Sequence, residues 1–312
     1  MHNSNQARRR LRARAIALIT VAAVPLVLAA CHAPSRESRQ LRRDCERGDI
    51  TACNRLAERF AKGQYALRDP ASAATMFDKA CDGGIGDACA NLGYAYQRGA
   101  GVDRDSVRAI NLYMQGCDRG GMEGCARLGA LYRKGTGVPQ DIGRAAALFE
   151  QACAGGNPLG CADLGSLYAS GEGVARDQSR AALLFRQACD STVAAGCLGL
   201  GLLHAHGAAV AHDDSAAAEL FHQACTGGEA AGCLHRGIAL ETGTGVKQSF
   251  ERAANLYWKG CQDGSGEACA RLASLHESGS GVGRSAERAS DLRKAACSHG
   301  HTESCPPKEE PR

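Results

Sequence analysis

Cysteine is the residue with the most evident chemistry in this chain of 312 residues, because 17 are present. Thiols persist in a reducing cytosol and oxidise to disulfides outside it. A count this high therefore predicts an oxidising compartment. Sixteen of the cysteines form eight pairs with a spacing of eight residues, namely Cys45 and Cys53, Cys81 and Cys89, Cys117 and Cys125, Cys153 and Cys161, Cys189 and Cys197, Cys225 and Cys233, Cys261 and Cys269, and Cys297 and Cys305.

Two disulfide pairings fit this spacing. Bridges within each pair use all sixteen cysteines, whereas bridges across 28 residues leave Cys45 and Cys305 without partners. Zinc binding is a third interpretation, but zinc sites usually show a CxxC motif or paired histidines, which these pairs lack. The sequence therefore predicts eight local bridges, Cys45-Cys53 and its seven equivalents, and no metal or other cofactor.

The seventeenth cysteine, Cys31, follows a segment typical of a bacterial lipoprotein signal peptide. Arginines gather in residues 8–14, and an apolar run extends from Ile16 to Leu28. The run is shorter than the roughly 20 residues that cross a bilayer, and small residues precede the cysteine, as at a cleavage site. We expect residues 1–30 to be removed, Cys31 to carry a lipid, and residues 31–40 to be a tether.

The charge of the chain argues against nucleic-acid binding. Five of its 37 basic residues lie in the expected signal peptide, which leaves 32 against 33 acidic residues. Binding to phosphates needs a basic surface. Residue 32 is His rather than an Asp that would favour retention in the inner membrane, so we expect a lipid anchor in the outer membrane, facing the periplasm or the exterior.

The cysteine pairs recur every 36 residues, which is the signature of a helical repeat array. In the unit that starts at Cys125, Leu128, Leu131 and Tyr132 have the spacing of an amphipathic helix. Gly135 is suited to end it. A residue that can cap a second helix follows in every unit: Asp69, Asp105, Asp141, Asp177, Asp213, Ser249 and Ser285.

Two short helices cannot bury both of their apolar stripes alone, so successive hairpins must stack. The predicted fold is an all-α, right-handed α-solenoid of seven 36-residue helical hairpins, each cross-linked by a disulfide. The array occupies residues 41–305, with a half-hairpin cap at 41–52, seven repeats at 53–304 and a tail at 306–312.

The pattern A-x-x-L-G-x-x-Y-x-x-G-x-G-V-x-x-D at residues 126–141 and 162–177 resembles the Sel-one-like repeat, a relative of the tetratricopeptide repeat. With C-x7-C in every unit, the chain is similar to the Helicobacter cysteine-rich protein family. The likeness extends over residues 45–305. Residues 63–66 and 207–209 depart from the G-x-G-V pattern, so reshaped loops are expected there.

Other chemistry has little support in the sequence. The G-x-G pairs follow a helix rather than a strand, so they indicate turns and not a nucleotide cradle. His204, His206, His212 and Asp213 faintly resemble a zinc site, but His204 occupies the column of the repeat tyrosines. We expect His204 to pack in the position of the repeat tyrosines rather than to bind a metal ion.

The resemblance implies an enzymatic alternative, since some cysteine-rich relatives are described as binding and slowly hydrolysing β-lactams. Serine enzymes of that class show S-x-x-K, S-D-N and K-T-G, and none of these strings occurs here. Residues 134–137, KGTG, are a near miss on a repeat turn. β-Lactamase activity therefore stays an alternative without an assigned catalytic residue.

A binding face is expected on the first helix of each unit, at the positions two, five and nine residues after its cysteine. In solenoids of this kind the first helices line the concave surface. The first three units would present a basic groove with an aromatic anchor, unless these residues are only a solvated polar face. The candidate binding residues are Arg55, Lys62, Asn91, Tyr94, Arg98, Arg127 and Lys134; the fifth and sixth units have Gly199, Leu202, His206, His235, Ile238 and Thr242 at these positions.

The function predicted from these features is an interaction scaffold at the cell envelope. A basic groove suits a carboxylate-rich peptide or a peptidoglycan stem. We expect a monomer that holds proteins, peptides or cell-wall fragments, reaches the membrane through its lipid anchor and does not bind nucleic acid.

Overall fold

Helices form all of the regular structure in the part of the chain that the computed structural model describes, residues 35–64 and 69–305. No strand occurs within those two ranges. The elements are α2 (Arg36–Glu46), α3 (Ile50–Lys62), α4 (Pro70–Asp82), α5 (Gly86–Arg98), α6 (Ser106–Asp118), α7 (Met122–Lys134), α8 (Ile142–Ala154), α9 (Pro158–Ser170), α10 (Gln178–Asp190), α11 (Ala194–His206), α12 (Asp214–Thr226), α13 (Ala230–Thr242), α14 (Phe250–Gln262), α15 (Gly266–Ser278), α16 (Ala286–Ser298) and the 3-10 turn η1 (Thr302–Ser304).

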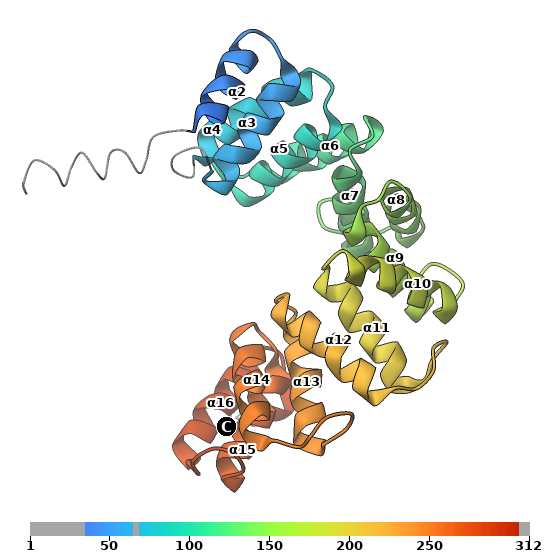
Figure 1. The fold of residues 1–312 in the computed structure, drawn as a ribbon, viewed down its shortest axis with the longest axis vertical. Helices are drawn as coiled ribbons and strands as arrows, with labels where there is room; N and C mark the ends of the chain where they lie inside the picture. The colour runs from blue at the N-terminus through green and yellow to red at the C-terminus, as the bar shows by residue number, and fades with distance from the viewer. Residues whose placement is uncertain (1–34, 65–68, 306–312) are drawn as a thin grey trace, which may run out of the picture. The chain divides into compact units, whose positions relative to one another are not determined.

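The chain divides into two compact units, Met1–Gly124 and Cys125–Arg312. In the first unit, each helix from α2 to α6 packs on the next one along the chain, and the same holds from α8 to α16 in the second (Figure 1). Successive packing of short helices is the architecture of an α-solenoid. The predicted fold class is confirmed within each unit, while the right-handed sense stays a prediction.

The second helix of each hairpin begins at the predicted cap. All seven capping side chains, from Asp69 to Ser285, accept a hydrogen bond from the backbone N–H three residues later. The distance is 2.9 Å for Asp141 and 3.3 Å for Ser285. Each bond satisfies a donor that the first helical turn leaves without a partner.

The N-terminal boundary differs from the sequence prediction. Helix α2 begins at Arg36, so residues 36–40 are helical rather than part of the expected tether, and the cap begins before residue 41. The Ser35 side chain accepts a hydrogen bond from the Ser38 backbone, and Glu37 pairs with Arg59 of α3 at 2.7 Å. Capping and this contact between helices stabilise the first turn of α2, although the polar composition of that turn indicates a loop. The first helix of the first repeat likewise begins at Ile50, three residues before Cys53.

Disulfides join the end of a second helix to the start of the next first helix, and the last one joins α16 to Cys305 at the end of η1. Bridges between cysteines eight apart are present as predicted: Cys45–Cys53, Cys81–Cys89, Cys153–Cys161, Cys189–Cys197, Cys225–Cys233, Cys261–Cys269 and Cys297–Cys305. Cys117 and Cys125 are disulfide-bonded too. Most of these sulfurs are buried. The bridges therefore belong to the core of the array and not to its surface.

Close approach within the hairpins depends on glycine. In the five middle repeats, a glycine of the first helix lies against an aromatic ring of the second helix, in the pairs Gly93 and Tyr113, Gly129 and Phe149, Gly165 and Phe185, Gly201 and Phe221, and Gly237 and Tyr257. The rings are buried. A Cβ atom on Gly165 would lie only 2.9 Å from the Phe185 ring. A bulky side chain at these positions would push the two helices apart.

The departure at residues 207–209 leaves the turn in its usual conformation. The second glycine of the G-x-G pair has a left-handed backbone, with φ of 70° at Gly173 and 69° at Gly245. Ala209 stands at this position in the fifth repeat and still has φ of 61°. The expected reshaping is therefore wrong there, because the turn retains its conformation at the cost of strain in a residue with a Cβ. Residues 65 and 66 of the other departing loop lie outside the described residues.

The helices of residues 35–64 and 69–305 do not combine the length and hydropathy that a membrane span requires. The expected signal peptide, the lipidated Cys31 and the tail at 306–312 lie outside the described residues.

Candidate functional site

The predicted basic groove is divided between the two units. Arg55, Lys62, Asn91, Tyr94 and Arg98 lie on α3 and α5 of the first unit. Arg55 pairs with Glu37 of α2 at 3.5 Å, and Lys62 lies 3.9 Å from Glu58. These carboxylates offset part of the positive charge that the sequence pattern indicates.

The remaining members keep the predicted exposure only in part. Tyr94 is 41% exposed, which suits an aromatic anchor, and Arg98 is exposed. Asn91 is half-buried. In the second unit, Arg127 is half-buried and Lys134 exposed on α7. Each unit thus carries a part of the predicted site, and ligand binding at these residues stays a prediction.

A cavity on the same helix face lies instead among α11, α12 and α13, in the second unit. Its volume is about 220 Å3. Five of the six predicted face residues of the fifth and sixth repeats line it: Leu202, His206, His235, Ile238 and Thr242. The rest of the lining is largely apolar, with Asp214 and Thr244 as further polar members: Ala205, Asp214, Ala217, Ala218, Phe221, Ala239 and Thr244. The structure thus brings the five face residues to one cavity, in the fifth and sixth repeats rather than in the first three, where the sequence predicts the ligand. Ligand binding on this face stays a prediction.

The signal for this cavity is a change in the type of face residue. The first three repeats have Arg55, Asn91 and Arg127 at the position two residues after the cysteine, where the fifth repeat has Gly199. Gly199 itself does not line the cavity, because the Phe185 ring fills the space beside it and would lie 2.6 Å from a Cβ atom there. In the sixth repeat the same position is His235, which stacks on the Phe221 ring of α12 with the two ring centroids 5.0 Å apart. The signal lies instead five residues after the cysteine, where the first two repeats have Glu58 and Tyr94 and the fifth and sixth have the apolar Leu202 and Ile238 of the cavity lining.

His235 is a titratable group of the cavity lining. It stacks on Phe221 with an angle of 27° between the rings. Burial lowers the pKa of His235 below its ordinary value of 6.5; Glu267 acts in the opposite direction, and His206 and Arg271 add to the lowering. The neutral imidazole is therefore the favoured form at neutral pH.

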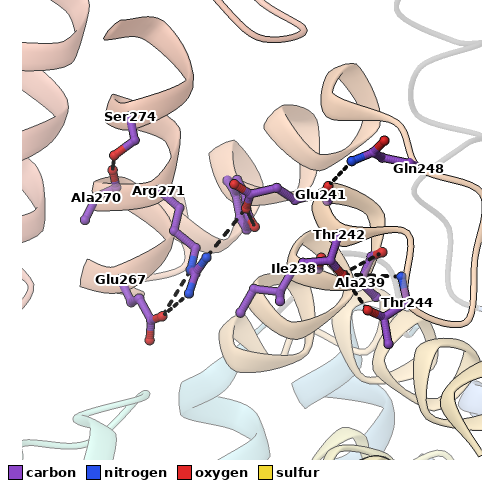
Figure 2. A network of polar contacts seen from close by, with 11 residues as sticks. Ile238, Ala239, Glu241, Thr242, Thr244, Gln248, Glu267, Ala270, Arg271 and Ser274 are labelled. Atoms are coloured by element: carbon purple, nitrogen blue, oxygen red, sulfur yellow. Dashed lines mark hydrogen bonds and ion pairs between the residues drawn. The ribbon is translucent and has the colours of Figure 1, made fainter. Parts of the chain in front are cut away.

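A polar network fixes the helices beside the cavity (Figure 2). Arg271 of α15 lies 3.1 Å from Glu267 on its own helix and 3.5 Å from Glu241 of α13. The Tyr257 hydroxyl donates to Glu241, and burial together with this carboxylate raises the pKa of Tyr257. Gln248 binds the Glu241 backbone carbonyl at 2.7 Å. These bonds hold α13 against α14 and α15 and so keep one wall of the cavity in place.

The hydroxyl groups at the rim of the cavity bond with each other and with the helix backbone. Thr242 donates to the Ile238 carbonyl at 3.0 Å, and its hydroxyl lies 2.7 Å from that of Thr244. The Ile238 carbonyl therefore has a hydrogen-bond partner, and the apolar side chain of Ile238 lines the cavity. The rim is polar, preorganised and able to bond with a ligand through the remaining hydroxyl capacity.

Lower pH should weaken the fold through His235. Because its pKa is lower in the folded chain than the value of 6.5 in the unfolded chain, stability is present above pH 6.5 and is lost as the pH falls towards the folded pKa. We expect the free energy of unfolding, measured by urea denaturation at pH 7.5 and pH 5, to decrease more for the native chain than for His235→Phe. All other histidines are common to both proteins, so equal decreases would contradict this prediction.

The histidines of the fifth repeat bond mainly with the backbone. His204 Nδ1 lies 3.1 Å from the Ala211 carbonyl, and His212 Nδ1 lies 3.1 Å from the His204 carbonyl. His212 Nε2 is 3.6 Å from the carboxylate of Asp214. Asp213 caps α12. Within residues 35–64 and 69–305, no three His, Cys, Asp or Glu side chains form a group that could hold a metal ion.

Comparison with known proteins finds similar repeat proteins in bacteria. The structure of c5321, a protective antigen present in uropathogenic Escherichia coli strains, matches with a TM-score of 0.63 and 26% identity over 86% of this chain and 57% of that one. This chain thus spans little more than half the length of c5321. A Sel1 repeat protein from Oxalobacter formigenes matches with a TM-score of 0.61 and 24% identity over 86% and 77% of the two chains.

The Helicobacter pylori cysteine rich protein B is also similar, with 25% identity over 42% of this chain and 93% of that one, at a TM-score of 0.35. No curated protein matches the chain. The Sel1 repeat matches seven times, at residues 50–85, 86–121, 123–157, 158–192, 194–229, 230–265 and 266–301. These matches begin close to the first helices seen in the structure, and they show that the chain belongs to the Sel1 repeat family.

Proposed function

We propose that the chain is a protein-binding scaffold that holds an extended peptide segment on its first-helix face, with one apolar side chain of the partner in the cavity among α11, α12 and α13. The observation that supports this most directly is that five face residues from two neighbouring repeats line one cavity. Sel1 repeat proteins generally mediate protein–protein interactions.

The size of the cavity favours a side chain over a whole small molecule. Its volume is about 220 Å3, whereas small-molecule sites usually measure roughly 300–1,000 Å3. A largely apolar lining with hydroxyl groups, imidazoles and the Asp214 carboxylate among its members is suited to an apolar anchor flanked by peptide bonds, which hydrogen-bond with these polar groups. A peptide or cell-wall stem peptide with such a residue is the proposed partner class.

Ile238→Glu is expected to abolish this binding. Peptides selected from a random display library on the oxidised protein should share one apolar anchor, and calorimetry should show at least about tenfold weaker binding to the variant, because a carboxylate would be buried against apolar groups. Ser274→Glu is the matched control, since Ser274 is an exposed face residue of α15 outside the cavity lining. Unchanged affinity of the selected peptides for Ile238→Glu would refute the proposal.

We also propose that a lipid on Cys31 anchors the scaffold in the cell envelope. The support is the arginine cluster, the short apolar run and the small residues that precede Cys31. Cys31→Ser should move the protein from the membrane fraction to the soluble periplasmic fraction and abolish labelling by palmitate. Persistent labelling of the variant would show that another residue carries the lipid, and an unlabelled native protein would contradict lipidation itself.

A further inference from the structure

A second cavity lies among α14, α15 and α16, and none of the first-helix face residues lines it. Its volume is about 700 Å3, within the range of roughly 300–1,000 Å3 that is usual for ligand sites. Its lining includes Trp258, His276, Arg288, Asp291, Leu292 and His299.

The cavity lies where the last hairpin departs from a contact that recurs in earlier hairpins. There, an arginine of the second helix lies over a tyrosine of the first helix: Arg108 over Tyr96, Arg144 over Tyr132 and Arg180 over Tyr168, at 4.7, 5.5 and 5.5 Å from the ring centroid. In the last hairpin, Arg288 is the equivalent arginine, but His276 stands in place of the tyrosine.

This replacement leaves both polar groups available. His276 is 8% exposed, and its Nδ1 lies 2.9 Å from the Gly283 carbonyl. That bond places the proton on Nδ1, so Nε2 is left to meet a ligand. The structure shows no ion pair or ring contact of the Arg288 guanidinium with any described residue, in contrast to the three earlier arginines.

The charges of the cavity favour an anion. Arg288 and His299 supply nitrogen donors, and the one carboxylate of the lining, Asp291, is paired with Lys294 at 3.0 Å. A guanidinium fork matches the geometry of a carboxylate and binds it through two hydrogen bonds.

The rest of the lining is suited to an apolar group. Trp258 of α14 is 52% exposed, which is unusual for an indole ring, and Leu292 and Ala295 of α16 belong to the same lining. An exposed aromatic ring beside an arginine is a frequent anchor for protein ligands. We propose that this cavity binds the C-terminal end of a partner peptide, with the terminal carboxylate on Arg288 and an apolar last side chain against Trp258 and Leu292.

The fluorescence of Trp258 tests the proposal directly, because it is the only tryptophan in the chain. The full oxidised protein is titrated with acetyl-Gly-Ala-Leu as the free acid and as the C-terminal amide. We expect a saturable change with the acid and at least about tenfold weaker binding of the amide. Equal affinity for the two forms, or no saturable change with the acid up to ~10 mM, would overturn the proposal.

His276→Tyr should close the cavity by restoring the arrangement of the earlier hairpins, and thereby abolish the response to the free acid. His204→Tyr is the matched control, because His204 occupies the same column and makes the same kind of bond from Nδ1, to Ala211. Binding that survives His276→Tyr in a folded protein would place the peptide elsewhere.

Arg288→Glu provides a second test that does not alter the packing. The charge reversal should weaken binding of the free acid by about a hundredfold and leave binding of the amide almost unaffected. Arg252→Glu, one repeat earlier on α14, should change neither affinity. Equal losses of affinity in the two arginine variants would overturn the specific role of Arg288.

A chain without residues 306–312 should bind the free acid as the full chain does. A fluorescence response seen only after this deletion would identify the C-terminal segment of the chain itself as the occupant of the cavity instead.

Discussion

Full reduction of the purified protein by dithiothreitol should abolish most of its helical circular dichroism at 37 °C. Each bridge closes a loop of about nine residues, which corresponds to roughly 2.5 kcal/mol on the chain-entropy estimate. Eight such contributions exceed the roughly 5–15 kcal/mol by which a typical protein is stable. The apolar core cannot compensate, because its layers consist largely of alanine, with one aromatic ring in most repeats.

Removal of a single bridge separates this effect from other actions of the reductant. Cys189→Ser with Cys197→Ser should lower the free energy of unfolding by about 2.5 kcal/mol, measured by urea denaturation. A larger loss is compatible with burial of the new hydroxyls, since both sulfurs are buried. If the helical signal survives when all cysteines are shown by mass spectrometry to be alkylated, the bridges do not hold the fold.

Gly165→Val should destabilise the second unit by about 3 kcal/mol, the upper range for overpacking of a core. A Cβ at this position would lie 2.9 Å from two atoms of the Phe185 ring and 3.4 Å from Leu184. Phe185 is buried, so its ring has no space into which it can withdraw. Valine adds two further methyl groups, and the helices α9 and α10 must separate. Urea denaturation followed by circular dichroism measures the loss.

Two variants define the cause of this effect. Gly165→Ala should destabilise the second unit by only about 1 kcal/mol, because a single methyl group requires a smaller shift of the Phe185 ring than valine does and alanine favours the helix over glycine. The first repeat supports this, since Ala57 occupies the equivalent position and is fully buried. Gly143→Ala on the exposed start of α8 meets only Asp141 at 3.5 Å and should be neutral or stabilising. A loss for Gly143→Ala as large as for Gly165→Val would assign the effect to helix propensity instead of packing.

The helices, their caps and the disulfides could be predicted because each depends on residues close in sequence. Asp141 caps α8 through a bond to a backbone N–H three residues away, and Cys153 bridges to a cysteine eight residues away. The start of α2 could not be predicted in this way. Its first turn is polar, and its stabilisation includes the pair between Glu37 and Arg59, which belongs to another helix.

For the candidate sites, the sequence could predict only which residues share one face of the first helices. The spacing placed Leu202, His206, His235, Ile238 and Thr242 on one side of the first helices, and the structure brings these five residues to one cavity. The choice of the first three repeats followed the positive charges. Glu37, which lies outside the repeats, pairs with Arg55 and offsets part of that charge.

The sequence by itself determined the 36-residue period, the helical hairpins and the local bridges, because these follow from propensity, capping and short loops within one unit. Only the tertiary structure decided where the array is hollow. A cavity forms where side chains from three helices fail to fill the space between them, as between Leu202, Phe221 and Ile238 and between Trp258, His276 and Arg288. Such a deficit depends on the volumes of residues far apart in the chain, and no periodic pattern records it.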